Sequence, residues 1–577
     1  MNPRMKRLVR NNAALIQVAL AARKAGVVFL LSAATALASP PTFNTLARFN
    51  GTDGQYPYDQ LVQGFNGNYY GTTAENGANG FGTVFEITPA GKLTTLYNFC
   101  SKSSCADGAN PSAGLAQAIS GNLYGTTYYG GANNAGTVFE ITPAGKLTTL
   151  YSFCSRSSCT DGQNPEAGLM QAPNGNFYGT TYLGGSSGCA GGCGTVFEIT
   201  PAGKLTTLYT FCSKSGCPDG SLPYAGLVQG TNGNFYGTTQ NGGATNNGTV
   251  FEITPTGRLT TLHSFCISGC GDGANPYGGL VQAANGNFYG TTYYGGAYSQ
   301  GTAFEMTPAG KLTRLYSFCA KSGCGDGANP NAGLVQGTNG DLYGTTYGGG
   351  ANNDGTVFAI TAAGKLTTLY SFCSQSGCAD GEHLYAALMQ ATNGTFYGTT
   401  RNGGSNGDFG TVFSDSVGLG PFVETLFTLG QVGANVVILG NNLTGSTAVS
   451  FNGKAAIFTL VSATEIKTIV PNGATTGAVT VTTPGGKLTS SVKFRVTPQI
   501  KSFTPTSGPV GMQVTITRVS LTQTTKVTFG GIAATSFTVD SDSEVTATVP
   551  TGAKTGQIAI TTLGGTAASS GIFTVTQ

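Results

Sequence analysis

Residues 113–165 read AGLAQAISGNLYGTTYYGGANNAGTVFEITPAGKLTTLYSFCSRSSCTDGQNP, and this unit decides the fold. It contains four short runs rich in Val, Thr, Phe and Tyr, each bounded by Gly, Asn, Pro or Asp, the residues that supply turn geometry. Its tetrapeptide Tyr-Gly-Thr-Thr recurs at steps of 54, 54, 58, 53, 54 and 54 residues, beginning at Tyr70, Tyr124, Tyr178, Tyr236, Tyr289, Tyr343 and Tyr397. Seven copies of a four-stranded unit predict the seven blades of a β-propeller.

The position of the outermost strand separates a closed ring from a linear β solenoid. Runs like LTTLYSF follow the first six units, but the seventh unit, which ends in Gly410-Thr411-Val412-Phe413, has none. A related run, FNTLARF, begins at Phe43, ahead of the first unit. We therefore expect an N-terminal strand to complete the last blade and close the ring, a displacement for which a solenoid has no use.

The repeated run YGTT, GG and GTVFEITPAGKLTTLYSF resembles the GloVer-type tandem-repeat proteins, which are exported bacterial chains. The resemblance extends from about Phe43 to Phe413. It implies display outside the cytoplasm, and it brings no catalytic residues with it.

Two further segments align with each other after a Gly-rich stretch. Residues 469–496 and 548–575 share a Val-Pro-x-Gly turn and a Val/Ile-rich strand, and they resemble the IPT/TIG immunoglobulin-like module. The predicted architecture is therefore all-β: signal peptide 1–38, propeller 39–414, linker 415–420, and immunoglobulin-like β-sandwiches 421–497 and 498–577. The second sandwich replaces the Gly-Asn-Asn of ILGNNL with Arg-Val-Ser at 518–520, which predicts a looser bend there.

The N-terminus indicates export. Basic residues up to Lys24 precede the apolar stretch from Gly26 to Ala38, which ends in a small-x-small cleavage motif. The stretch is shorter than the roughly 20 residues of a membrane-spanning helix, so a retained anchor is the lesser alternative.

The cysteines agree with an oxidising compartment. All 14 fall into close pairs with no recurring His nearby, which favours disulfides over zinc sites: Cys100/Cys105, Cys154/Cys159, Cys189/Cys193, Cys212/Cys217, Cys266/Cys270, Cys319/Cys324 and Cys373/Cys378.

Composition limits the partner. The chain has 9% charged residues, a formal charge of +3 and no block of like charges, which argues against nucleic acid and favours a neutral extracellular glycan or protein. A propeller places its Cys-pair loops and Tyr/Gly/Asn-rich loops on one face, and we expect a ligand there.

Two sets of side chains on that face are candidate ligands. The Tyr residues that follow YGTT vary between units and suit carbohydrate rings, although packing between loops explains them equally well: Tyr128, Tyr129, Tyr182, Tyr293, Tyr294 and Tyr347. The Asp residues before the innermost strands, either oxygen ligands for a cation such as calcium or structural Asx turns, recur in every unit and include Asp107, Asp161, Asp272 and Asp326. We expect no cofactor beyond that weak calcium alternative.

A third ring is formed by Gln63, Gln117, Gln171, Gln229, Gln282, Gln336 and Gln390, at the ends of the innermost strands. These amides are expected to border a water-filled channel.

Evidence for catalysis is thin. His263 replaces a repeated Tyr and His383 a repeated Asn, and neither has an evident nucleophile or metal partner. Two Gly-x-Ser-x-Gly matches lie in glycine-rich β loops rather than before a helix. Glutamates such as Glu86 are expected to pair across strands with Lys or Arg.

These observations favour an exported, non-enzymatic binding or adhesion protein, with the loop face as receptor and the sandwiches as spacer or dock. A carbohydrate-active lyase or hydrolase and a purely structural surface-layer component remain as alternatives. The sequence leaves open the ligand, the oligomeric state, and whether the protein stays at the surface.

Overall fold

The computed structural model describes residues 42–185, 188–405 and 407–577. The predicted signal peptide and its cleavage site lie outside these residues, as do parts of both Gly-x-Ser-x-Gly matches. Within the described part, no helix is long and apolar enough to cross a membrane.

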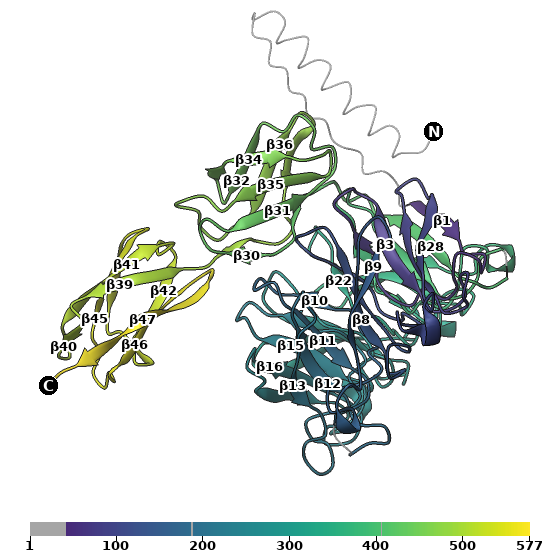
Figure 1. The fold of residues 1–577 in the computed structure, drawn as a ribbon, viewed down its shortest axis with the longest axis horizontal. Coiled ribbons are helices and arrows are strands. Elements are labelled where there is room, and N and C mark those ends of the chain that lie inside the picture. Colours follow the sequence, from purple (N-terminus) through teal and green to yellow (C-terminus); the bar gives the residue numbers. More distant parts are fainter. Residues whose placement is uncertain (1–41, 186–187, 406) are drawn as a thin grey trace, which may run out of the picture. The chain divides into compact units, whose positions relative to one another are not determined.

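The repeats form seven four-stranded antiparallel sheets, the blades (Figure 1). Blades 1 to 3 are β2–β5 (Val62–Gln63, Tyr69–Thr73, Thr83–Ile87, Leu93–Asn98), β6–β9 (Ala116–Gln117, Leu123–Thr127, Thr137–Ile141, Leu147–Ser152) and β10–β13 (Met170–Gln171, Phe177–Thr181, Thr195–Ile199, Leu205–Thr210). Blades 4 to 6 are β14–β17 (Val228–Gln229, Phe235–Thr239, Thr249–Ile253, Leu259–Ser264), β18–β21 (Val281–Gln282, Phe288–Thr292, Thr302–Met306, Leu312–Ser317) and β22–β25 (Val335–Gln336, Leu342–Thr346, Thr356–Ile360, Leu366–Ser371). Blade 7 is β26–β28 (Met389–Gln390, Phe396–Thr400, Thr411–Ser416) with β1 (Thr42–Arg48) at its outer edge.

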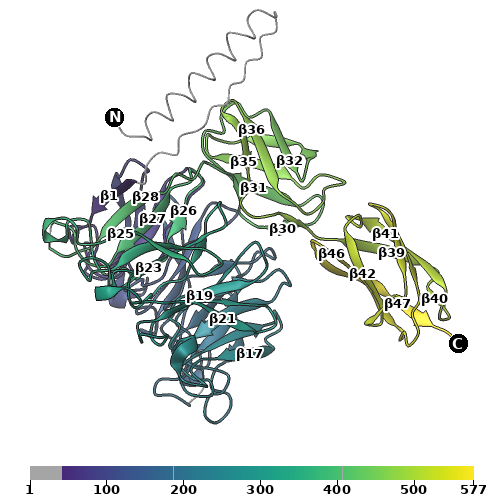
Figure 2. The same cartoon turned by 180° about the vertical axis from the view of Figure 1, so that it is seen from behind.

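The N-terminal strand completes blade 7, as the sequence predicts. Strand β1 pairs antiparallel with β28 from Thr42 opposite Ser416 to Arg48 opposite Thr411, and Figure 2 shows both strands beside β27 and β26. Strand β28 includes Asp415 and Ser416, the first two residues of the segment expected to be a linker, because they pair with Phe43 and Thr42 of β1. The repeats therefore close into a ring instead of extending as a solenoid.

The two threonines of each YGTT tetrapeptide explain why that sequence recurs. In blade 2 the Thr126 hydroxyl donates to the carbonyl of Ala167 in blade 3 at 3.1 Å, and the Thr127 hydroxyl pairs with Thr137 on the adjacent strand at 2.9 Å. The first of these bonds recurs between all neighbouring blades, with donors Thr72, Thr126, Thr180, Thr238, Thr291, Thr345 and Thr399. The bond from Thr399 reaches Pro57 of blade 1 and closes the ring.

The Tyr and Gly of the same tetrapeptide bind strand to strand within a blade. The Tyr124 hydroxyl donates to Glu140 at 2.7 Å. A Cβ on Gly125 would lie 2.6 Å from the ring of Phe139, so only glycine lets that ring pack there. The glutamates of the third strand are thus acceptors for phenol and amide donors. None of the three ion pairs among the described residues involves them. The expected Lys and Arg partners act at longer range: burial raises the pKa of Glu86 and Glu252, but hydrogen bonds from Asn and Tyr side chains, helped by the charge of Lys92 or Arg258, leave it below its ordinary value.

The glutamine ring also joins blades. Three side-chain carbonyls accept backbone N–H groups from the turn of the preceding blade, in the pairs Gln282 with Thr231, Gln336 with Ala284 and Gln390 with Thr338. Gln63 binds Thr392 of blade 7 in the same way, at 2.9 Å, and donates back to its hydroxyl at 3.0 Å. These amides therefore clasp neighbouring blades as well as bordering the channel.

The core lies between the blades. Tyr70, Val84 and Phe99 of blade 1 pack against Leu123 and Phe139 of blade 2, and every neighbouring pair has an equivalent cluster. At the seam the ring centroids of Tyr69 and Tyr397 are 4.2 Å apart. Each blade is therefore stable only against its neighbours, which is the usual physics of a repeat protein.

All seven predicted disulfides are present, and no described cysteine is free. Six of them tie the loop that follows a fourth strand, and the Cys189–Cys193 bridge ties a loop within blade 3. Short 3₁₀ turns occur in five of these loops, at Ser103–Cys105, Ser157–Cys159, Cys270–Asp272, Ser322–Cys324 and Ser376–Cys378.

Two β-sandwiches follow, each with its own core. The first has sheets β29-β31-β35-β34 (Glu424–Thr425, Asn435–Leu439, Glu465–Ile469, Phe458–Leu460) and β33-β32-β36-β37 (Lys454–Ala456, Ala448–Phe451, Val479–Thr483, Gly486–Thr489), and the pair β30 and β38 (Leu429–Gly430, Arg495–Val496). The second has sheets β39-β41-β45-β44 (Gln499–Thr504, Gln513–Val519, Glu544–Thr548, Phe537–Ser541) and β40-β47-β46-β42-β43 (Ser507–Gly508, Gly565–Val575, Gly556–Thr562, Thr524–Phe529, Ile532–Ala533).

Replacing Thr126 by Val tests the bond between blades. The change keeps the shape of the side chain but leaves the Ala167 carbonyl without its donor, so we expect the free energy of unfolding to fall by about 1–2 kcal/mol. Thr148→Val, on the exposed face of β9, is the matched control and should stay within about 0.5 kcal/mol of the wild type. Equal effects of the two changes in denaturant titrations would contradict the role given to Thr126.

Replacing Ser520 by Gly tests the bend of the second sandwich. Ser520 has a φ of 63° and a buried hydroxyl without a partner, whereas the first sandwich has Asn442 at the matching position with a φ of 54°. Because Gly adopts this conformation freely, the change should stabilise the second sandwich by about 1 kcal/mol. Asn442→Gly should change stability little, and calorimetry of the full chain measures both.

Candidate functional site

One set of side chains that differ between repeats meets at one end of the central channel. Each repeat ends in an Asn-Pro dipeptide or a related pair, and the residue directly after that pair changes from blade to blade. In all seven blades this residue lines one hollow of about 470 Å³. The seven residues are Tyr58, Ser112, Glu166, Tyr224, Tyr277, Asn331 and Tyr385. A scaffold position repeats in every blade, whereas this position does not. It therefore marks a candidate site.

Tyrosine rings surround that end of the channel, and we call Tyr58, Tyr182, Tyr224, Tyr277, Tyr293, Tyr347 and Tyr385 the tyrosine collar. Their rings contact one another edge to face. The centroids are 5.2 Å apart for Tyr58 and Tyr385, 5.3 Å for Tyr347 and Tyr385, 5.2 Å for Tyr224 and Tyr277, 5.2 Å for Tyr277 and Tyr293, and 6.1 Å for Tyr182 and Tyr224. Such pairs hold each ring in a fixed orientation.

Arg401 and Gln240 fasten the collar. The Arg401 guanidinium lies 4.6 to 5.3 Å from the rings of Tyr56, Tyr58 and Tyr385, and its Nε donates to the Tyr58 hydroxyl at 2.8 Å. The Gln240 amide donates to the Tyr277 hydroxyl at 2.7 Å. Arg401 and Gln240 occupy the position directly after YGTT, so the two variable positions of the repeat contact each other here.

Three of the six predicted tyrosines, Tyr182, Tyr293 and Tyr347, belong to the collar. Tyr128 also lies near the collar. Its position there has an electrostatic consequence: burial and then the charge of Glu166 raise the pKa of Tyr128 to about 12. Tyr129 and Tyr294 pack edge-on against Tyr128 and Tyr293 but remain 45% and 49% exposed. The prediction missed Tyr58, Tyr224, Tyr277 and Tyr385, which belong to the loop before the innermost strand.

The predicted aspartates hold their own loops. The Asp107 carboxylate accepts hydrogen bonds from the Tyr97 hydroxyl at 2.7 Å and from the backbone N–H groups of Ser101 and Lys102 at 2.9 and 3.1 Å. Burial raises the pKa of Asp107, but these bonds outweigh it and leave the pKa below its ordinary value.

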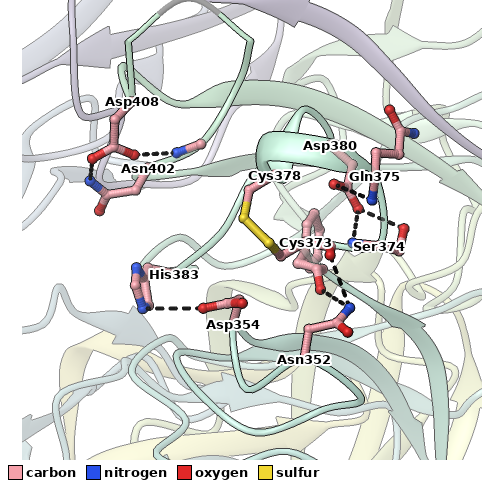
Figure 3. Close-up of a disulfide and its surroundings, with 12 residues drawn as sticks. Asn352, Asp354, Cys373, Ser374, Gln375, Cys378, Asp380, His383, Asn402 and Asp408 are labelled. Carbon is pink, nitrogen blue, oxygen red and sulfur yellow. Dashed lines mark hydrogen bonds and ion pairs between the residues drawn. A yellow bond between two sulfur atoms is a disulfide. The ribbon is translucent and has the colours of Figure 1, made fainter.

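The other predicted aspartates have similar partners. Asp161 and Asp326 accept bonds of the same kind, and Figure 3 shows the equivalent Asp380 with the N–H groups of Ser374 and Gln375. In blade 4 the His263 ring takes the place of the tyrosine and lies 2.9 Å from Asp272, which also accepts the backbone N–H of Cys266 at 3.1 Å. These contacts fit the structural interpretation of the Asp ring, and the binding proposal below does not use it.

A second group of departures from the repeat lies where blades 6 and 7 meet. His383 Nε2 is 3.9 Å from Asp354 (Figure 3). The His383 ring also stacks on the ring of Tyr347, with the centroids 4.6 Å apart. Asp408 accepts hydrogen bonds from Asn402 and from the backbone of Gly403, at 2.8 and 2.6 Å. His383, which the sequence alone marks as incidental, therefore belongs to a cluster.

Glu382 completes this cluster. Burial raises the pKa of Glu382 to about 7, and the nearby charges of Asp408 and Asp354 add to the effect. The sequence does contain a sign of this cluster, because the last two repeats replace common residues at these positions. The replaced positions are, however, spread over more than fifty residues.

The carboxyl groups of Asp354 and Glu382 adjoin Cys373 and Cys378, whose sulfurs form a disulfide and are not free to bind a metal. The same holds for the four cysteines gathered in blade 3.

Fold and site together define a disulfide-tied, seven-bladed β-propeller with a tyrosine-lined opening and two immunoglobulin-like domains. The chain belongs to the Gloeobacter/Verrucomicrobia repeat family, whose model matches residues 16–189, 155–281 and 267–454. The IPT/TIG domain model matches residues 421–496 and 498–576. Both resemblances expected from the sequence are thereby confirmed.

Solved structures give weaker likenesses. A fungal alcohol oxidase of the AA5 family in complex with copper is 13% identical, with 79% of this chain and 99% of that chain covered and a TM-score of 0.44. The extracellular domain of a putative hybrid two-component system from B. thetaiotaomicron is 9% identical, covering 91% and 73%, with a TM-score of 0.43. A surface glycan-binding protein from Prevotella bryantii is 17% identical, covering 26% and 39%, with a TM-score of 0.21. No curated protein matches the sequence.

Replacing Asp107 by Ala separates a structural aspartate from a calcium ligand. We expect the change to lower the free energy of unfolding by about 2 kcal/mol, because several donors in one loop lose their acceptor. Added calcium should leave the melting temperature of both proteins unchanged. A calcium-dependent rise in the wild type that the variant lacks would make the Asp ring a cation site.

Proposed function

We propose that this chain is an exported binding protein that takes a carbohydrate at the tyrosine collar. One observation carries the proposal: two positions of the repeat that vary from blade to blade, one directly after YGTT and one in the loop before the innermost strand, converge on the same opening of the channel. They meet at a hollow of about 470 Å³, which is large enough for a small ligand.

The chemistry of the opening suits sugar rings. Tyrosine faces pack against the apolar C–H surfaces of a pyranose, and the Tyr, Ser, Asn and Glu side chains around them donate and accept hydrogen bonds with hydroxyl groups. The rings are already held by their neighbours and by Arg401, so little side-chain entropy is lost on binding. The low overall charge of the chain fits an uncharged or weakly charged partner.

The remaining parts of the chain support a location outside the cytoplasm. Seven disulfides close short loops, a pattern typical of oxidising compartments. The basic and then apolar N-terminus is typical of a secretory signal. The two immunoglobulin-like domains act as a spacer or as a dock for a further surface component, as such modules do when they carry no site of their own.

A carbohydrate-active enzyme is the second candidate, and Glu382 favours it. Burial raises the pKa of the Glu382 carboxyl group to about 7, in the range that suits a general acid near neutrality, and the Asp354 and Asp408 side chains lie beside it. Incubation with each glycan that binds, followed by assay of new reducing ends or unsaturated products, distinguishes this candidate from binding alone. Cleavage that Glu382→Gln abolishes would replace our proposal with the enzymatic one.

Alanine at Tyr224 or Tyr385 tests the collar on a glycan array and then by calorimetry. Each change removes one ring and loosens its neighbours, so affinity for a glycan bound by the wild type should fall at least about tenfold, or about 1.4 kcal/mol. Tyr129→Ala, an exposed tyrosine outside the collar, is the control and should bind as the wild type does.

Three results would contradict the proposal. Equal losses for Tyr224→Ala and Tyr129→Ala would place the binding surface elsewhere on the propeller. Binding unaffected by any of the changes would move it to the immunoglobulin-like domains. No binding to any glycan would leave the structural surface-layer role as the better account.

A further inference from the structure

The channel beneath the tyrosine collar is acidic. Apart from tyrosines, the ionisable side chains that line it among the described residues are Asp59, Glu166 and Glu424, and no Lys or Arg is among them. This is unusual for a chain whose formal charge is +3. Three carboxyl groups in one hollow favour a ligand that brings positive charge.

Glu166 differs from Asp59 in lacking a protein partner. Asp59 accepts backbone N–H groups of Gly114 and Gln60 at 2.6 and 2.7 Å, which satisfy its carboxylate. No described residue donates a hydrogen bond to Glu166 or forms an ion pair with it. Burial alone raises the pKa of Glu166 to about 7. A carboxyl group held in this way costs free energy whenever it ionises, unless a cation enters beside it.

Tyrosines lie close to Glu166: Tyr224 lines the same hollow, and the ring of Tyr182 packs edge-on against Tyr224 with the centroids 6.1 Å apart. Burial and then the charge of Glu166 raise the pKa of Tyr128, Tyr182 and Tyr224, so these three phenols are its electrostatic neighbours. Tyrosine faces attract cations at short range, and the attraction strengthens where water is excluded. A carboxylate among three tyrosines is therefore complementary to a cation in two independent ways.

The arrangement fits an organic ammonium group better than a metal ion. Calcium takes six to eight oxygen ligands at 2.3–2.6 Å, from carboxylates, carbonyl groups and water. The described residues contain two groups with at least three ligand atoms within 4.8 Å of one another, and neither includes Glu166, Asp59 or Glu424. An ammonium group needs only one carboxylate and nearby aromatic faces.

We propose that Glu166, with Tyr128, Tyr182 and Tyr224, forms a subsite for a protonated amino group, so that the preferred carbohydrate is a sugar with a free amine. This inference rests on the proposed carbohydrate-binding function and narrows its ligand class. A glutamate stands at this position in one blade only, and the equivalent positions of the other six blades hold Tyr, Ser or Asn. The channel therefore has a single amine subsite of this kind.

The test is titration calorimetry of the full chain with three tetrasaccharides of the same linkage: β-1,4-linked glucosamine, its N-acetylated form, and cellotetraose. At pH 6 we expect the free amine to bind at least tenfold more tightly than the N-acetylated form. Glu166→Gln, which keeps the shape and removes the charge, should reduce this preference below threefold without weakening binding of the N-acetylated form more than twofold. Glu75→Gln removes an equal charge from an exposed position on the same face and should preserve the preference.

Proton release gives a readout that a structural role of Glu166 would not move. Because the pKa of Glu166 is about 7 in the free protein, binding of an ammonium group at pH 6 should expel its proton. The apparent binding enthalpy should then depend on the ionisation enthalpy of the buffer in the wild type and not in Glu166→Gln.

The outcomes separate the two proposals. If all three tetrasaccharides bind equally, or the preference for the free amine survives Glu166→Gln, the amine subsite is wrong and carbohydrate binding stands. If none of them binds and the glycan array is also negative, both proposals are wrong.

Discussion

The structure depends on one repeated hydrogen bond, from the first threonine of each Tyr-Gly-Thr-Thr to a backbone carbonyl of the next blade. The bond lies in the buried space between sheets, where a lone donor or acceptor costs most. It occurs seven times, so the ring is held in the same way at the seam as elsewhere. The glutamine clasps and the packing of aromatic rings between blades reinforce that geometry. The channel and its opening exist only because the ring closes with these contacts in register.

The repeat separates scaffold from site. Positions that are the same in every blade face a neighbouring strand or blade: the tyrosine of YGTT, which binds a glutamate in five blades, the glycine beneath a phenylalanine ring, and the two threonines. The aspartates of the cysteine loops belong to this group, since their oxygens are used by their own loops. Positions that vary, such as Glu166, Gln240 and Arg401, face the opening. A ring of equal units thereby supports an asymmetric surface without altering its own bonds.

Local pattern was enough to predict the strands, the blade count, the closing role of the N-terminal strand and the disulfides. Turn residues, strand propensity and the absence of an LTTLYSF-like run after the seventh unit are all visible along the chain. The collar was only half predictable, because Tyr182, Tyr293 and Tyr347 follow an obvious motif while Tyr224 and Tyr385 lie in a loop that looks like a connector. The neighbours of His383 were hidden for the same reason: Asp354 and Asp408 come from other parts of the repeat array. Contacts across the ring depend on its closure, which no single unit encodes.

The strand that closes the ring has a consequence for the order in which the molecule assembles. Strand β1 is synthesised before all the blades, but its partner β28 is synthesised after them. Until β28 appears, β1 has no sheet to join, and until β1 docks, β28 presents an open edge to any other chain. Contacts this distant in sequence form slowly. We therefore expect closure to be a late and slow step of propeller folding. A chain that loses its first strand after synthesis would retain six complete blades and one edge prone to pair with a second molecule.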